Sequence, residues 1–143
     1  MNPVFHLVYV SHASDSLSYT DIRNILNSSR KNNARDNISG VLILREGHFL
    51  QVLECDDEHK VRHLVNVIRN DDRNKNLKIL IETQSERRLF GDWSMAFLDG
   101  DIEANTTKDL LEFFEVCLDS GINHKTLIMP LIRRFRAAAP NFQ

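Results

Sequence analysis

A predicted β-hairpin in the first half of the chain most limits how this sequence can fold. Two short apolar runs, Val41–Leu44 and Phe49–Leu53, are separated by the tight-turn composition Arg45-Glu46-Gly47-His48. Apolar runs of this length on both sides of a short polar turn are typical of paired strands. We therefore predict strands at about 39–45 and 48–54.

The second strand of this hairpin contains a polar residue where apolar residues are expected. Strand alternation places Gln51 on the same face as Phe49 and Leu53. An amide on an apolar face needs hydrogen-bond partners, because leaving it unpaired costs about 1–3 kcal/mol. Taken alone, Gln51 is most simply a core glutamine bonded to the backbone. A ligand site is the alternative, and the rest of the chain bears on that choice.

Strand and helix periodicities alternate on both sides of the hairpin. Ser18 and Asp21 form a capping pair at the start of the first helix, which we expect to end in the polar run Ser28–Asn33. The predicted elements are a strand at Val4–Ser11, a helix from Ser18, the two hairpin strands, a helix with Val61, Leu64, Val65 and Ile68 on its buried face, and strands at Leu77–Thr83 and Trp93–Leu98.

This order, β-α-β-β-α-β-β, predicts an α+β, ferredoxin-like fold with a five-stranded mixed sheet and two helices on one face. We expect the first and third strands to be central, parallel neighbours. Tyr9 and Gln51 would then lie on adjacent strands beneath the helices, near Asn32 and Asn33 at the end of the first helix. One phenol and three amides among apolar walls predict a small-molecule pocket.

The composition changes after Leu98, which divides the chain into a ligand-binding domain at 1–98 and an extension at 99–143. Helical patterns at about 105–118 and 126–139 predict that this extension contains two helices. Apolar side chains surround the first of them almost completely. That helix therefore needs packing partners on more than one side.

Composition argues against several partners and locations. The 143 residues carry a formal net charge of −2, which gives no general attraction to nucleic acid. Apolar runs reach only about five residues, far short of a membrane span. The N-terminus lacks a secretory signal, and Cys55 and Cys117 lack metal-ligand spacing. A reducing, cytoplasmic location is the expectation.

Four motifs together resemble a BLUF domain, a blue-light sensor that uses FAD. They are Tyr9 near the end of the first strand, Asn32-Asn33 ahead of Ile38-Ser39-Gly40, the strand Phe49–Glu54, and Asp92–Met95. The resemblance covers about residues 4–98. It implies a short, stand-alone photoreceptor and not an enzyme.

The resemblance implies an FAD ring between the two helices, with Tyr9 as the photochemical donor of an electron and a proton. Gln51 would hydrogen-bond between Tyr9 and the ring, and light would rearrange those bonds. Output would pass through the C-terminal helices to a partner protein or a homo-oligomer. The implied cofactor contacts are Tyr9, Ile25, Asn32, Asn33, Phe49, Gln51, Leu53 and Asp71, and the implied signal relay is Trp93, Ser94 and Met95.

Two positions depart from the family pattern. Family members often carry an arginine just before the isoleucine of the second helix, where this chain has Val67, with Arg69 two residues later. Cys55 stands where glycine is usual. These departures concern contacts at the edge of the flavin and leave Tyr9 and Gln51 unchanged.

Other functions are compatible with the same topology. A small acyl-phosphate hydrolase would need a phosphate-binding loop, and Ser11–Ser14 has no glycine to form one. An RNA-binding module would need exposed aromatic side chains and a basic face, whereas this chain is slightly acidic. His59 and His63 could begin a metal site, but without a third ligand they indicate a solvated helix face.

Overall fold

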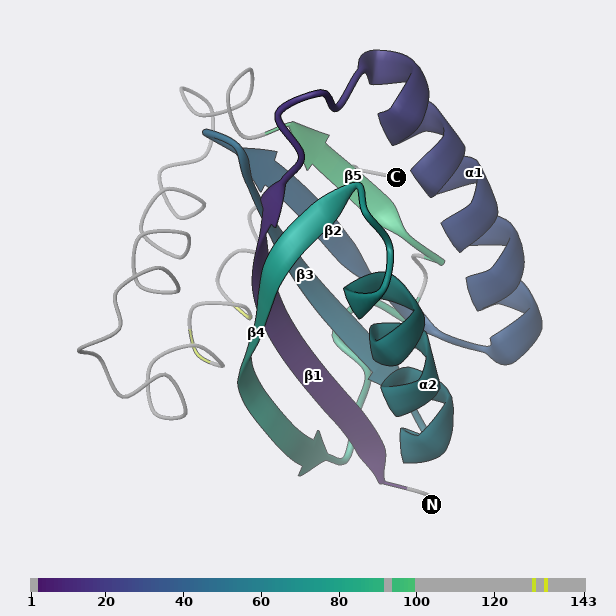
Figure 1. Cartoon of the computed structure of the whole chain (residues 1–143). Coiled ribbons are helices and arrows are strands. Elements are labelled where there is room, and N and C mark those ends of the chain that lie inside the picture. The colour runs from purple at the N-terminus through teal and green to yellow at the C-terminus, as the bar shows by residue number, and fades with distance from the viewer. Residues whose placement is uncertain (1–2, 92–93, 100–129, 131–132, 134–143) are drawn as a thin grey trace.

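The computed structural model describes residues 3–91, 94–99, 130 and 133 (Figure 1). Asp92, Trp93 and the predicted C-terminal extension at 99–143 therefore lie outside the described residues, except for Asp99, Pro130 and Arg133. Pro130 and Arg133 are helical and exposed, and Asp99 is in a strand. The elements, in chain order, are β1 (Val4–Ala13), α1 (Tyr19–Asp36), β2 (Ser39–Arg45), β3 (His48–Cys55), α2 (Glu58–Arg69), β4 (Asn74–Ser85) and β5 (Ala96–Asp99).

The five strands form one mixed sheet in the order β4-β1-β3-β2-β5. β2 pairs with β5 in parallel, and the other neighbours are antiparallel. Both helices cover the same face of this sheet (Figure 1). The predicted α+β, ferredoxin-like fold is thereby confirmed for the described residues.

The expectation that β1 and β3 are parallel was wrong. The two strands are central neighbours, but they pair antiparallel, with Tyr9 opposite Gln51. The crossover through α1 brings β2 back parallel to β1, with room for one strand between them. The two-residue turn at Glu46 and Gly47, both with positive φ, then reverses the chain. β3 therefore enters the gap antiparallel to both neighbours.

Helix α1 begins as predicted but ends later. Ser18 caps it through a reciprocal pair of bonds, Asp21 N to Ser18 Oγ at 3.1 Å and Ser18 N to Asp21 Oδ2 at 3.0 Å. The helix continues through the polar run and stops at Asn37, whose φ of 59° is left-handed. The run stays helical because two of its side chains, Arg30 and Asn33, bond to another segment instead of to their own backbone.

Helix α2 buries the stripe that its periodicity predicted, although unevenly. Val61 and Val65 are fully enclosed, whereas Leu64 and Ile68 are only partly buried. The latter two border the pocket described below, which accounts for their exposure. No helix in the described ranges is long and apolar enough to cross a lipid bilayer.

Strand β5 begins at Ala96, later than predicted. The carbonyl groups of Ser94 and Met95 accept hydrogen bonds from α1 side chains, so these two residues precede the sheet. Pairing with β2 starts only where Ala96 lies opposite Val41.

Gly40 permits the close contact between β2 and β3. A Cβ atom at this position would lie 1.9 Å from the carbonyl oxygen of Val52. We expect Gly40→Ala to lower the free energy of unfolding by about 3 kcal/mol or more, because two paired strands must separate to admit the methyl group. Gly91→Ala is the matched control, since the nearest atom to its Cβ would be an Arg88 side-chain carbon at 3.4 Å. Equal loss in both variants, measured by urea unfolding, would contradict this account.

Candidate functional site

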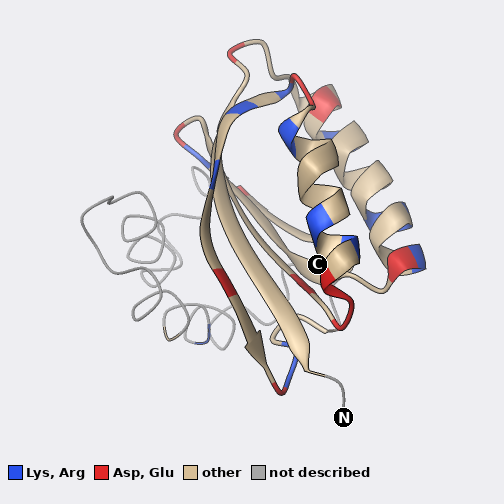
Figure 2. Ribbon diagram, turned by 60° about the horizontal axis from the view of Figure 1, so that its bottom comes forward, with Lys and Arg blue, Asp and Glu red and all other residues tan. Residues whose placement is uncertain are grey.

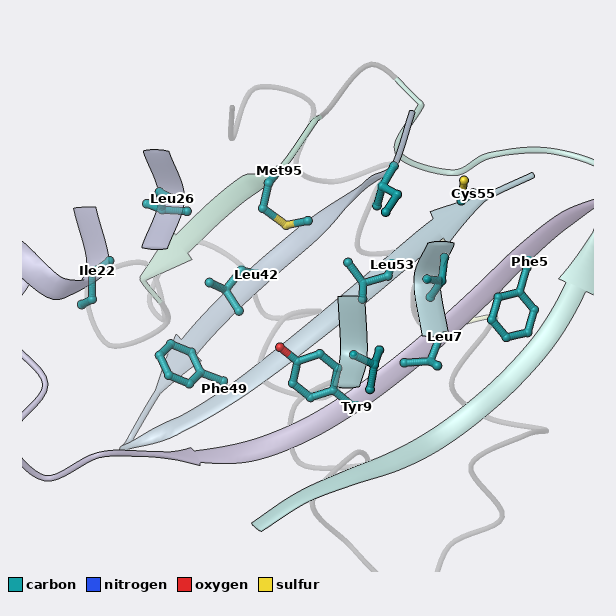
Figure 3. Packing of buried hydrophobic residues seen from close by; sticks show 13 residues of the cluster. Phe5, Leu7, Tyr9, Ile22, Leu26, Leu42, Phe49, Leu53, Cys55 and Met95 are labelled. Carbon is teal, nitrogen blue, oxygen red and sulfur yellow. The ribbon is translucent and has the colours of Figure 1, made fainter. Parts of the chain in front are cut away.

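A pocket opens between the two helices and the covered face of the sheet. Its empty volume, which includes space open to solvent, is about 740 Å³. Figure 3 shows three of its sheet side chains, Tyr9, Leu42 and Phe49, grouped on one face from three neighbouring strands. The lining residues are Tyr9, Ile25, Ser28, Ser29, Asn32, Asn33, Leu42, Phe49, Gln51, Leu64, Val67, Ile68, Asp71, Arg73 and Asn74.

The floor of the pocket carries a chain of three hydrogen-bonding side chains. The Tyr9 hydroxyl donates to Gln51 Oε1, and Gln51 Nε2 donates to the Met95 sulfur at 3.3 Å. All three residues are buried. The strand register sets Tyr9 opposite Gln51, which makes the first bond possible. Met95, which directly precedes β5, supplies the acceptor of the second bond.

The protonation state of Tyr9 is fixed by its surroundings. Burial raises the pKa of its phenol well above the ordinary value, and the negative charge of Asp71 adds to that effect. The phenol therefore keeps its proton across the physiological pH range and acts as a donor. Gln51 must then present its oxygen to Tyr9, which leaves its amide nitrogen for Met95.

The wall formed by α1 is polar where it meets this chain of bonds. Asn33 is buried, lines the pocket, and donates through Nδ2 to the Ser94 carbonyl at 3.1 Å. Arg30 Nε donates to the Met95 carbonyl at 3.0 Å. The segment that carries Met95 is thus held by side chains from α1 as well as by Gln51.

An ion pair marks the polar side of the pocket. Arg73 donates to the Asp71 carboxylate through two nitrogens, from Nη2 to Oδ2 at 2.5 Å and from Nε to Oδ1 at 2.9 Å. Hydrogen bonds from Arg73 lower the pKa of Asp71, so the carboxylate stays charged. Both groups are partly exposed, which favours a role at the mouth and not in the floor.

Most of the side chains that the sequence assigned to cofactor binding are brought together here. Of the eight, seven line the pocket, and Leu53 does not: it is fully enclosed in the neighbouring hydrophobic cluster. Of the assigned relay residues, Ser94 and Met95 touch the site through α1 and Gln51, and Trp93 lies outside the described residues.

Sequence reasoning missed the arginine of this pocket. The family resemblance put the corresponding position at Val67, with Arg69 two residues later. Val67 does line the pocket but is apolar and 55% exposed, and Arg69 is not among the lining residues. The guanidinium comes instead from Arg73, in the loop after the helix. The available signal was its position two residues after Asp71, where a short turn lets both side chains face the same way.

The other missed lining residues had been assigned to elements but not to the site. Leu64 and Ile68 were expected to be core residues of α2, and Leu42 a core residue of β2. Ser28 and Ser29 were expected to terminate α1. They line the pocket because α1 continues past them over the sheet.

A second buried polar cluster lies on the opposite face of the sheet, around the carboxylate of Glu54. It accepts from Ser39 Oγ at 2.8 Å, from Leu89 N at 2.8 Å and from Phe90 N at 2.5 Å. His6 Nδ1 lies 3.3 Å from the same carboxylate. These contacts join β3 to the segment that leads toward Ser94.

Glu54 should make stability depend on pH. Burial alone raises its pKa, but the contacts with His6, Leu89 N, Ser39 and Phe90 N outweigh burial and hold the pKa below the ordinary value. A depressed folded-state pKa gives stability that is present above the unfolded pKa and is lost as pH falls through the folded one. We expect Glu54→Gln to cost about 1–3 kcal/mol at neutral pH and to flatten the loss of stability in acid. Urea unfolding from pH 7 to pH 3 measures both, and parallel curves for the two proteins would contradict the assignment.

Charges elsewhere on the described surface are mixed. Figure 2 shows Lys and Arg interspersed with Asp and Glu over both helices and the outer strands. His59 and His63 are exposed on α2. In the described ranges, no group of three or more His, Cys, Asp or Glu side chains is arranged to hold a metal ion.

Comparison with known proteins gives a family for this site and fold. The model of the family described as "Sensors of blue-light using FAD", BLUF, matches residues 4–96. The blue light- and temperature-regulated antirepressor BluF of Escherichia coli (strain K12) is 28% identical over 93 residues, which are 65% of this chain and 23% of that protein. The chain thus spans less than a quarter of that relative's length.

Solved structures of BLUF proteins share the whole architecture. The dark-state structure of the BLUF protein BlrB superposes with a TM-score of 0.79 at 25% identity and covers 98% of each chain. The ground state of BlsA gives a TM-score of 0.72 at 25% identity, over 90% of this chain and 87% of that one. With the motif matches, the strand order and the pocket all in agreement, the chain belongs to the BLUF family of blue-light sensors that use FAD.

Proposed function

We propose that the pocket between the two helices binds FAD and that Tyr9, Gln51 and Met95 form its light-operated switch. The observation that carries this proposal is the chain of bonds from the Tyr9 hydroxyl through the Gln51 amide to the Met95 sulfur. Tyr9 and Gln51 line the pocket itself, and Met95 is buried next to Gln51. Each of these three side chains can change bonding partner without carrying a net charge.

The chemistry of the pocket fits a flavin. Ile25, Phe49 and Leu64 offer apolar walls for a flat aromatic ring, and Asn33 and Gln51 offer amides for its polar edge. Asn32 and Ser28 add polar groups on α1. At the mouth, Arg73 could pair with a phosphate of the nucleotide tail, in competition with its present partner Asp71. Leu53 we assign to the core behind the wall.

Tyr9 and Gln51 would have different roles in the switch: Tyr9 would donate an electron and a proton, and Gln51 would change its hydrogen bonds. Bound FAD would supply the absorption of blue light and the acceptor for an electron. Tyr9 would give up that electron and pass its phenolic proton to Gln51 Oε1, and both would return when the cycle closes. Gln51 can rotate its amide or change tautomer while its charge stays zero. After a rotation its nitrogen would no longer face Met95, so the Met95 sulfur would lose its donor.

Output would begin at this lost bond. Met95 stands directly before β5, and the predicted relay Trp93–Met95 connects the pocket to residues 99–143. We propose that these C-terminal residues carry the change to a partner protein or to a second copy of the chain. The Escherichia coli relative is a blue light- and temperature-regulated antirepressor, which supports a protein partner. Sedimentation of the full chain in darkness and under blue light should differ, and should not differ in Gln51→Leu.

The cofactor itself can be identified directly. We expect the purified protein, denatured and chromatographed against FAD, FMN and riboflavin, to release FAD in near-stoichiometric amount. Protein purified without flavin should bind added FAD. Failure both to carry and to take up any flavin would overturn the proposed function.

A further inference from the structure

One turn of α1 holds two consecutive carbonyl groups of the segment before β5. Arg30 Nε donates to the Met95 carbonyl at 3.0 Å, and Asn33 Nδ2 donates to the Ser94 carbonyl at 3.1 Å. Arg30 and Asn33 are three residues apart, so both project from the same side of the helix. We call these two donors the carbonyl clamp.

The side chain of Met95 depends on this clamp for its position. Met95 is only 2% exposed, and its sulfur accepts from Gln51 Nε2 at 3.3 Å. A thioether is a weak acceptor on a side chain with three rotatable bonds. It stays within reach of Gln51 only if the backbone from which it extends is fixed. The Met95 carbonyl accepts its hydrogen bond from Arg30.

We propose that Arg30 is a positioning residue for the Gln51 switch. By holding the Met95 backbone against α1, it keeps the sulfur where the Gln51 amide can donate to it. It thereby favours the orientation of Gln51 that accepts from Tyr9. This inference rests on the proposed photoreceptor function, and it adds a residue that neither lines the pocket nor belongs to the Tyr9–Gln51–Met95 chain.

The clamp should affect the speed of the return to the dark arrangement. Return to the dark arrangement requires Gln51 Nε2 to form its hydrogen bond to the Met95 sulfur again. If the Met95 sulfur is loosely held, the free energy of the dark arrangement is higher, and so is the free energy of the transition state that leads to it. The Arg30 guanidinium is charged but only partly buried, so we expect it to contribute about the 0.5–1.5 kcal/mol of an ordinary hydrogen bond, which corresponds to a two- to tenfold change in rate. Arg30→Met, which keeps most of the apolar stem but removes the donor, should therefore slow dark recovery about two- to tenfold.

Matched variants separate positioning from general damage. Arg35→Met is the control, because Arg35 lies on the same helix, is exposed and pairs with its neighbour Asp36. It should recover at the wild-type rate. Arg30→Lys keeps a donor that can reach the carbonyl and should restore much of the rate. A purely structural role of Arg30 would show no such rescue.

A double-mutant cycle tests the route through the Met95 side chain. In a Met95→Leu background the acceptor sulfur is gone, so adding Arg30→Met should change dark recovery by less than about 1.5-fold. The same slowing in both backgrounds would show that Arg30 acts by another route and would overturn the proposal. An unchanged recovery rate in Arg30→Met alone would overturn it as well.

A readout without flavin distinguishes failure of this inference from failure of the photoreceptor function. In flavin-free protein, amide hydrogen exchange of peptides covering residues 94–99 should be roughly fivefold faster in Arg30→Met than in Arg35→Met, for a loss of about 1 kcal/mol. Equal exchange in the two variants would contradict the clamp even if the wild type responds to light. If the wild type shows no light response but the exchange difference is present, the carbonyl clamp is supported and the photoreceptor function is refuted.

Discussion

Replacing Gln51 with leucine should leave the flavin bound and abolish the light-induced spectral shift. Leucine fills nearly the same volume on an apolar floor, so the walls at Ile25 and Phe49 remain. What it removes is the amide that accepts from Tyr9 and donates to Met95. Without a group that can exchange donor and acceptor, the flavin ring has no partner whose hydrogen bonds can change. The expected shift is zero within error, against a clear red shift in the wild type.

The control for this experiment is Gln84→Leu. Gln84 lies on β4 and is exposed, so its replacement tests whether any loss of glutamine changes the photocycle. The two variants should carry equal amounts of flavin, and only Gln51→Leu should lack the shift. A normal, reversible shift in Gln51→Leu would remove Gln51 from the switch.

Replacing Tyr9 with phenylalanine should have an equally large effect for a different reason. The change removes one oxygen and leaves the ring in place, so the pocket floor keeps its shape. It removes both the phenolic proton and the most easily oxidised side chain on the floor. Gln51 Oε1 also loses its donor, which should cost about 1 kcal/mol of stability. Flavin should remain bound, and the blue-light response should be lost.

Tyr19→Phe is the matched variant, because Tyr19 is 75% exposed at the start of α1. Absorption difference spectra after identical flashes compare the two proteins. We expect a wild-type response in Tyr19→Phe. A response of full amplitude in Tyr9→Phe would mean that another residue gives the electron.

The features that could be predicted from the sequence are those encoded within one segment. The hairpin was located by two apolar runs around a turn, and the start of α1 by Ser18 and Asp21. Gln51 was identified because an amide on an apolar face demands partners. Tyr9 could be placed beside it because neighbouring central strands share a face whatever their direction.

The features that were wrong or missed depend on contacts between distant segments. Strand direction follows from how the α1 crossover and the hairpin combine, and local periodicity does not contain it. The end of α1 was placed too early because its polar residues find partners 61 and 65 positions away. The same bonds delay the start of β5. Arg73 was missed because its importance comes from the turn that pairs it with Asp71.

The absorption spectrum of the purified 143-residue protein, recorded in darkness and again after a blue flash, tests the central claim most directly. The account predicts an oxidised flavin spectrum that moves slightly to the red after the flash and returns in darkness. The pocket, the Tyr9–Gln51–Met95 chain and the family membership all lead to that result. A bound flavin whose spectrum does not move would contradict the switch, and protein that cannot be loaded with flavin would contradict the pocket assignment.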